Sequence, residues 1–404
     1  MKRKRKSMGS YTELTDRTSI EYLKNHTNFF SPEDKVVSTE IGDGNVNWVF
    51  RINTSDNSTS VIFKQALPYL RILGDGWPLT IDRSRIEAET TKTFGRICPD
   101  CVPRVLHDDP EMAVAVFEDL GYLELMRTEL MQMRCFPKFP EQMGFFLART
   151  FLHTSHLVMD AGSKKEAVKK YVNPELCKLV EDLVFTDPFF DAPGNNVNPE
   201  LRAEAESIWS QPQLFLEASC LKEIYMNKAQ SLIHGDLHTG SIFINENEIR
   251  VFDAEFAFYG PPSYDMGCVL GNLLLNYASW EAHPDRNQQE IKEYRDYLMK
   301  SFVETYDSFK THFMEIWHSD VREEFTRVKG FAEQCLKDHL RESIGFAGCE
   351  CIRRTLGLAH TPDTSSLEND KLRARAQKYA LGIGQKLLLS WNDIESIDQA
   401  ADMI

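Results

Sequence analysis

The chain lacks any long hydrophobic run and lacks an excess of basic residues. No apolar segment approaches the about 18 residues that a membrane-spanning helix needs, so we expect no membrane partner. The 46 Lys and Arg residues stand against 61 Asp and Glu residues, which gives a formal net charge of −15. Because nucleic-acid binding depends on clustered Lys and Arg, this balance argues against a nucleic-acid partner. It is compatible with a single nucleotide, which glycines, one lysine and metal ions hold locally.

The nine cysteines lack the spacing of a disulfide or zinc framework. Cys98 and Cys101 form a lone CxxC, and a structural zinc site needs four ligands at paired spacing. We therefore expect reduced thiols in a cytoplasmic protein. Residues 2–6 are all basic, but polar residues follow them instead of the apolar segment of a signal peptide. This favours a disordered basic tail over residues 1–10, with a nuclear-localisation signal as the alternative.

The pattern of strands and helices predicts an α+β protein of two lobes. A 404-residue chain with 42% hydrophobic residues is long enough for one large domain or two of ordinary size. Residues 11–120 are predicted to form a small β-rich N-terminal lobe that binds a nucleotide and ends in a hinge. Residues 121–404 are predicted to form a larger, mainly helical C-terminal lobe with the catalytic loop and the substrate site. Within the first lobe we expect strands at 35–41, 48–53, 60–66 and 112–117, helices at 13–25 and 82–96 with Asp82 as an N-cap, and a loop around residues 68–78.

Three carboxylates in residues 236–255 carry most of the chemical information. Residues 241–252 predict a hairpin that turns at 245–247, so its two ends lie close together. Asp236 precedes the hairpin, and Asp253 and Glu255 follow it. Their mutual repulsion would be compensated by a divalent cation and a polyphosphate.

Each of these acidic residues has a chemical role that suits its position. Asp236 is the candidate base that accepts the proton of a substrate hydroxyl as its oxygen attacks a γ-phosphorus. Asp253 and Glu255 alternate in what we expect to be extended chain, so both face one side and suit Mg²⁺. The alternative is an exposed acidic strand end. His234 and His238 flank Asp236, and we interpret both as structural supports of the loop.

Upstream residues suggest a nucleotide site. Gly42 and Gly44 lie between two predicted strands, where glycines let the backbone approach phosphates, although Asp-Gly is also typical of a plain hairpin turn. Asn47 adds an amide for a phosphate or ribose. Lys64 lies in an apolar strand, where it either points to solvent or reaches the α- and β-phosphates, paired with Glu87 or Glu89 on the next helix. Glu87 is the preferred partner.

Two further groups lie outside these segments. The backbone of residues 118–120, Glu118-Asp119-Leu120, would bind an adenine edge if the boundary between the lobes is a nucleotide site, and is otherwise an acidic turn. Arg353 and Arg354 are adjacent on a predicted helix, so their side chains are expected to diverge by about 100° unless they lie near a helix end. One of them would then steady the transferred phosphoryl group; taken alone, the pair is also compatible with a surface position.

Together these motifs resemble the small-molecule kinases of protein-kinase-like fold, and most closely the family of 5-methylthioribose kinases. The similarity extends from about residue 12 to residue 390. The pairing of Asp253-Ala254-Glu255 with the motif His-Gly-Asp-Leu-His-Thr-Gly-Ser is specific to this family among kinases. The segments that carry the resemblance are residues 40–47, 76–83, 234–241, 253–260 and 344–360.

The resemblance implies an ATP-dependent kinase that phosphorylates the 1-hydroxyl of 5-methylthioribose in methionine salvage, as a cytoplasmic homodimer. A related choline- or aminoglycoside-type kinase is the alternative. Asp236 matches the catalytic and substrate-binding Asp, and Asp253 and Glu255 match the Mg²⁺ ligands. The other matched positions are Gly42, Gly44, Asn47, Lys64, Glu118, Asp119, Leu120, Asp253, Ala254 and Glu255 for ATP, and Trp77, Arg353 and Arg354 for the substrate.

Two positions depart from the wider protein-kinase pattern. Ser241 stands where protein kinases carry a metal-binding Asn, which removes a good ligand. Glu255 stands where they carry the Gly of Asp-Phe-Gly, which adds a carboxylate. The gained ligand would offset the lost one.

Overall fold

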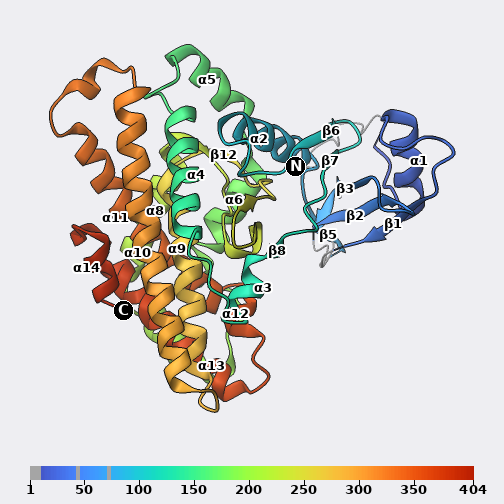
Figure 1. Cartoon of the computed structure of the whole chain (residues 1–404). Coiled ribbons are helices and arrows are strands. Elements are labelled where there is room, and N and C mark those ends of the chain that lie inside the picture. The colour runs from blue at the N-terminus through green and yellow to red at the C-terminus, as the bar shows by residue number, and fades with distance from the viewer. Residues whose placement is uncertain (1–10, 42–45, 71–73) are drawn as a thin grey trace, which may run out of the picture. The chain divides into compact units, whose positions relative to one another are not determined.

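The computed structural model describes residues 11–41, 46–70 and 74–404, and the chain divides into two units (Figure 1). The first unit contains the chain up to Tyr122 together with Phe252–Phe256. The second contains Leu123–Val251 and Ala257–Ile404. The acidic pair Asp253 and Glu255 therefore belongs to the first unit, although the strands on either side of it belong to the second.

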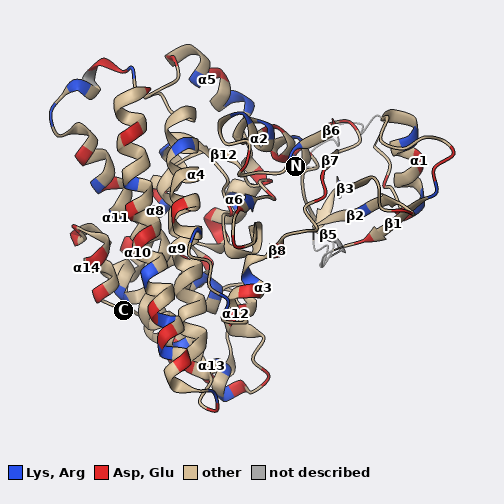
Figure 2. Cartoon of the chain, viewed as in Figure 1, with Lys and Arg blue, Asp and Glu red and all other residues tan. Residues whose placement is uncertain are grey.

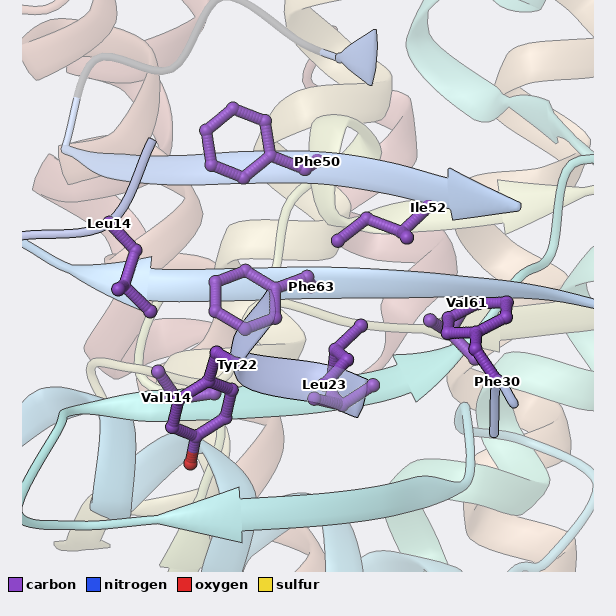
Figure 3. Packing of buried hydrophobic residues seen from close by; sticks show 10 residues of the cluster. Leu14, Tyr22, Leu23, Phe30, Phe50, Ile52, Val61, Phe63 and Val114 are labelled. Atoms are coloured by element: carbon purple, nitrogen blue, oxygen red, sulfur yellow. The ribbon is translucent and has the colours of Figure 1, made fainter. Parts of the chain in front are cut away.

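The first unit is built on a five-stranded antiparallel sheet with the order β1-β2-β3-β7-β6. Alternate residues of a strand face opposite sides of a sheet, so the apolar residues Phe50, Ile52, Val61 and Phe63 point to one face. Figure 3 shows these side chains packed with Tyr22 and Leu23 of helix α1. The elements of this sheet and its helix are α1 (Asp16–His26), β1 (Val36–Glu40), β2 (Asn47–Thr54), β3 (Ser60–Ala66), β6 (Val105–Asp109) and β7 (Val114–Glu118).

The opposite face of the sheet packs on helix α2 (Arg83–Ile97), where Ala88 contacts a cluster that includes Ala115. Lys64 pairs in register with Ala115 on β7, one position after the core residue Phe63. The strand alternation therefore turns Lys64 away from the α1 core and toward α2.

A local prediction in this unit is wrong. The predicted loop around residues 68–78 contains a short pair of antiparallel strands, β4 (Tyr69–Leu70) and β5 (Gly74–Pro78). Asp82 is confirmed at the N-cap position of α2, although its carboxylate makes no capping bond. It accepts hydrogen bonds from Arg85 Nε at 2.7 Å and Nη2 at 2.6 Å instead.

The second unit is mainly helical and carries two small sheets. The predicted hairpin is confirmed as β10 (Ile242–Ile244) and β11 (Ile249–Val251), with β8 (Glu124–Leu125) added at the edge of β10. Strand β9 (Ser231–Ile233) pairs with β12 (Phe258–Gly260). The helices are α3 (Met126–Leu130), α4 (Phe139–Thr154), α5 (Ala161–Lys170), α6 (Pro174–Leu183), α7 (Arg202–Trp209), α8 (Pro212–Asn227), α9 (Pro262–Ser279), α10 (Gln288–Ser319), α11 (Phe331–Leu356), α12 (Pro362–Ser365), α13 (Asp370–Ser390) and α14 (Ile397–Asp402).

Helices α9 and α11 form the buried centre of this unit. Gly271 on α9 permits their close approach, because a Cβ atom at this position would lie only 2.8 Å from Cβ of Glu350 on α11. The contact fixes the C-terminal half of α11, which carries Arg353 and Arg354, against α9. This packing determines where the two arginines lie.

Acidic and basic residues alternate along the outer helices of the second unit, such as α10 and α13 (Figure 2). Over the described part of the chain, no helix is long and apolar enough to cross a membrane.

Candidate active site

The loop after β9 is held in place by a buried carboxylate of α9. Asp265 accepts hydrogen bonds from the backbone N–H groups of His234 at 2.7 Å and Gly235 at 3.0 Å. Gly235 has φ 84°, a left-handed conformation that glycine adopts without strain. Nδ1 of His234 accepts from the backbone N–H of Asp236 at 3.3 Å. His234 and Asp265 are thus structural supports of the loop, as predicted for His234.

Asp236 lies at the end of this loop beside two guanidinium groups and the imidazole of His238. Its Oδ1 is 3.3 Å from Nη2 of Arg353 and 3.6 Å from Nη2 of Arg354, and its Oδ2 is 3.3 Å from Nε2 of His238. Burial acts to raise the pKa of Asp236, but His238 and the two guanidinium groups outweigh it and hold the pKa well below its ordinary value. The carboxylate is therefore ionised at neutral pH, and 28% of its side chain is exposed.

His238 contacts the Asp236 carboxylate in a defined tautomer. Its Nδ1 accepts a hydrogen bond from the backbone N–H of Gly240 at 3.1 Å, so in the neutral ring the proton is on Nε2, which faces Asp236. Burial, together with the charge of Arg127, lowers the pKa of His238 despite the neighbouring carboxylate. His238 is thus a neutral donor to Asp236. Ser241 is a local support, because its hydroxyl donates to the carbonyl oxygens of His238 at 2.8 Å and Asp236 at 3.1 Å.

Arg353 and Arg354 converge, and they lie near a helix end, which is the exception to the predicted divergence. Glu350 lies three and four positions earlier on α11, on the helix face that both can reach. It accepts from Nε of Arg353 at 2.5 Å and Nε of Arg354 at 2.9 Å. Both residues lie in the last turn of the helix, where their ends turn toward Asp236. Burial acts to raise the pKa of Glu350, but the two guanidinium groups outweigh it and lower the pKa to about 2.

In the first unit, Lys64 is the centre of an acidic cluster. Its Nζ contacts Oε1 of Glu87 at 2.9 Å and Oε2 at 2.8 Å, and it also donates to Asp253. The preferred partner Glu87 is confirmed, whereas Glu89 lies 3.7 Å from Lys92. Burial acts to lower the pKa of Lys64, but the surrounding carboxylates outweigh it and raise the pKa. For Glu87 burial is dominant and raises the pKa to about 7.

Asp253 and Glu255 differ in conformation and surroundings. Asp253 has φ 69°, so the predicted extended chain is wrong here; Asp is among the residues that tolerate the left-handed region. Its side chain is 45% exposed. Glu255 is buried, where its Oε2 accepts from Nδ2 of Asn47 at 2.9 Å and lies 3.3 Å from Nε of Arg83.

The donor atoms of this cluster suit a hard divalent cation. One carboxylate oxygen from each of Glu87, Asp253 and Glu255 lies within 4.8 Å of the others. Magnesium prefers carboxylate oxygen and retains water on its remaining positions, which a partly exposed Asp253 permits. Lys64 contacts both Glu87 and Asp253, and Glu255 contacts Asn47 and Arg83. The assignment of Asp253 and Glu255 as the metal ligands therefore stays a prediction.

In the predicted adenine-binding segment, both acidic side chains are paired with arginines, so only the backbone is available to a ligand. Glu118 binds Nε of Arg104 at 2.7 Å, and Asp119 binds Nε of Arg51 at 2.8 Å. The backbone of Leu120 makes no hydrogen bond to any residue that the structure describes. A donor and an acceptor are therefore available at this position.

For the remaining predicted site residues, the structure gives little evidence of a role. Gly42 and Gly44 lie outside the described residues. Trp77 lies in strand β5, and its contact with substrate stays a prediction. Ala254 is buried between the two acidic residues.

Several residues of these clusters were missed at the level of sequence. The role of Glu350 could have been found in the sequence, because a carboxylate three and four positions before two arginines on one helix predicts ion pairs. No sequence pattern indicates the roles of Arg83 and Arg127, since most of their partners are distant in sequence. Arg83 is fully buried and donates to three backbone carbonyl oxygens and to Asn47.

Comparisons with known proteins agree with this chemistry. A family model described as "Phosphotransferase enzyme family" matches residues 173–299. The chain is 40% identical over 391 residues to a methylthioribose kinase of Yersinia enterocolitica, covering 97% of this chain and 98% of the relative. A methylthioribose kinase of Geobacillus sp. is 40% identical over 386 residues, covering 96% and 94%.

Among solved structures, a choline kinase of Cryptosporidium parvum superposes with a TM-score of 0.50 at 14% identity, covering 95% of this chain and 97% of that one. This likeness supports the predicted fold class and carries no statement about substrate.

Proposed function

Because the chain belongs to the methylthioribose kinase family, we propose that it transfers the γ-phosphoryl group of ATP to the 1-hydroxyl of 5-methylthioribose. The products are 5-methylthioribose 1-phosphate and ADP, in methionine salvage. The observation that carries this proposal is the ionised Asp236, held by a braced loop beside two arginines.

The proposed step needs a base and a group that steadies developing charge. Asp236 accepts the proton of the 1-hydroxyl as that oxygen forms a bond to the γ-phosphorus and the bond to the β,γ-bridging oxygen breaks. Arg353 donates hydrogen bonds to both Glu350 and Asp236. Arg354 donates to Glu350 as well, but its buried Nη2, 3.6 Å from Asp236, makes no hydrogen bond among the described residues. We therefore assign Arg354, more than Arg353, to an oxygen of the substrate or the phosphoryl group.

The nucleotide would be bound by the first unit. The backbone of Leu120 suits the adenine edge, and Lys64 suits the α- and β-phosphates, with Glu87 holding its ammonium group. Asp253 and Glu255 would hold Mg²⁺. When bound, the cation neutralises phosphate charge and orients the triphosphate.

Asp236 follows strand β9, and Asp253 and Glu255 lie between β11 and β12 along the chain. We propose that the three carboxylates act on one bound ATP, in a cytoplasmic homodimer.

Substrate profiling tests this function. Purified protein with ATP and Mg²⁺ should release ADP when 5-methylthioribose is added, and should not do so with choline, an aminoglycoside or ribose. A product phosphorylated at the 1-position, identified by phosphorus NMR, is the expected result. Comparable turnover with any of the three control acceptors would overturn the assignment.

A further inference from the structure

Arg127 connects three elements around the catalytic loop. It lies on the short helix α3 with only 12% of its side chain exposed. Its Nε is 3.3 Å from the hydroxyl of Thr239 in the loop and 3.5 Å from Oδ2 of Asp363 on α12. Its Nη2 donates to Oδ1 of Asn272 on α9 at 3.1 Å. One planar guanidinium group thus spans the loop and two helices.

In the loop after Asp236, the absence of a side chain at Gly240 leaves space for the guanidinium group of Arg127. A Cβ atom at Gly240 would lie 2.6 Å from Nη1 of Arg127 and 2.9 Å from its Cζ. Gly240 is not among the described glycines with positive φ, so its backbone does not require glycine there. The requirement is steric, since any larger residue would displace the guanidinium group.

A continuous chain of hydrogen bonds leads from Arg127 to the arginine pair. Oδ1 of Asn272 accepts a hydrogen bond from Arg127, and its Nδ2 donates to Oε1 of Glu350 at 3.0 Å. The same oxygen of Glu350 accepts from Nε of Arg354 at 2.9 Å. The amide of Asn272 is fixed in orientation, because its Nδ2 also donates to the carbonyl oxygen of Cys268 at 2.9 Å.

We propose that Arg127 is a positioning residue of the phosphoryl-transfer site, which locks the loop after Asp236 through Thr239 and orients the Arg353–Arg354 pair through Asn272 and Glu350. The expected effect on turnover rests on the proposed function, whereas the expected effect on the pKa of His238 does not. Misplacing a catalytic group by about 1 Å costs on the order of 100-fold in rate, so loss of this support acts on turnover.

The charges around the loop give a second, independent consequence. The described cluster contains three guanidinium groups, on Arg127, Arg353 and Arg354, and three carboxylates, on Asp236, Glu350 and Asp363. His238 faces Asp236, with Arg127 and Arg354 nearby. Both guanidinium groups favour the neutral imidazole, whereas Asp236 favours the charged one. Removal of the charge at position 127 therefore raises the pKa of His238.

The experiment compares Arg127→Met, Arg127→Lys and Gly240→Ala with the wild-type enzyme. Arg127→Met removes both the charge and the planar set of hydrogen-bond donors, whereas Arg127→Lys retains only the charge. Gly240→Ala displaces the guanidinium group without removing it. Arg202→Met is the matched control, because Arg202 is a half-exposed arginine that also has two carboxylate partners, Asp191 and Glu206. Circular dichroism and thermal unfolding establish that each variant is folded.

Arg127→Met and Gly240→Ala should lower kcat by about 10- to 100-fold with the KM for ATP within about twofold of wild type. Arg127→Lys should recover part of kcat, and Arg202→Met should leave kcat unchanged. In nitrogen-15 NMR titrations, His238 should titrate at higher pH in Arg127→Met and near its wild-type pH in Arg127→Lys.

Wild-type kcat in folded Arg127→Met, or an unchanged His238 titration in that variant, would overturn the proposal. The titration needs no turnover. If wild-type protein fails to phosphorylate 5-methylthioribose while His238 shifts as expected, the proposed function fails and the positioning role does not.

Discussion

Replacement of Glu350 by Gln tests whether one buried carboxylate holds the arginine pair. Glu350 accepts Nε of both Arg353 and Arg354 and is almost completely buried, with 1% of its side chain exposed. Its pKa falls from 4.5 to about 2 in the folded chain. A change of that size corresponds to about 3 kcal/mol of stability at neutral pH. Breaking one partner of a buried ion pair costs a similar 3–5 kcal/mol in other proteins.

The pH dependence of this loss has a defined sign. Because the folded pKa is depressed, the stabilisation from Glu350 is fully present above about pH 4.5 and disappears as the pH falls toward 2. Urea denaturation of wild type and Glu350→Gln should therefore differ by about 3 kcal/mol at pH 7, and by progressively less below pH 4.5.

Glu350→Gln should also lose turnover, because its arginines are no longer held toward Asp236. Glu206→Gln is a suitable control, since Glu206 forms an exposed ion pair on α7. A difference in unfolding free energy below about 1 kcal/mol at pH 7, the upper end of what an exposed ion pair typically contributes, would refute the reasoning. So would a difference that stays constant between pH 7 and pH 3.

Three further substitutions test the remaining parts of the site. Asp236→Asn should lower kcat by about 10²- to 10⁴-fold while the dissociation constant for ATP, measured by calorimetry, changes little; near-wild-type turnover would remove Asp236 from the mechanism. Lys64→Met should weaken ATP affinity and lower kcat, and it should leave Glu87 without its ammonium partner; unchanged ATP binding would mean that Lys64 serves only the local fold. Glu255→Gln should raise the Mg²⁺ concentration needed for half-maximal activity, whereas an unchanged magnesium titration and ATP affinity would leave Glu255 a purely structural partner of Arg83 and Asn47.

Short-range patterns were sufficient to predict the main strands and several of the pairings. The hairpin β10–β11 and the pairing of Lys64 with Glu87 were expected because they depend on turn residues and on one strand facing the next helix. One wrong prediction concerns a place where a long-range polar contact is present. Asp253 leaves the extended conformation while it contacts Lys64, 189 positions earlier in the chain.

The network behind Asp236 could not be predicted from spacing alone. Arg127 lies 112 positions before Thr239 and 145 before Asn272, so only the folded chain brings these partners together. Gly240 likewise becomes informative only when Arg127 is seen beside it. By contrast, the convergence of Arg353 and Arg354 has a local cause in Glu350, one turn earlier on α11.

We propose above that Asp236, Asp253 and Glu255 act on one triphosphate. A crystal structure of the complex with Mg²⁺, a non-hydrolysable ATP analogue and 5-methylthioribose tests it most directly. We predict Mg²⁺ on the carboxylates of Asp253 and Glu255, and the 1-hydroxyl within hydrogen-bonding distance of Asp236 and about 3–3.5 Å from the γ-phosphorus. A cation bound elsewhere, or a sugar hydroxyl far from Asp236 with the γ-phosphate out of its reach, would contradict the account.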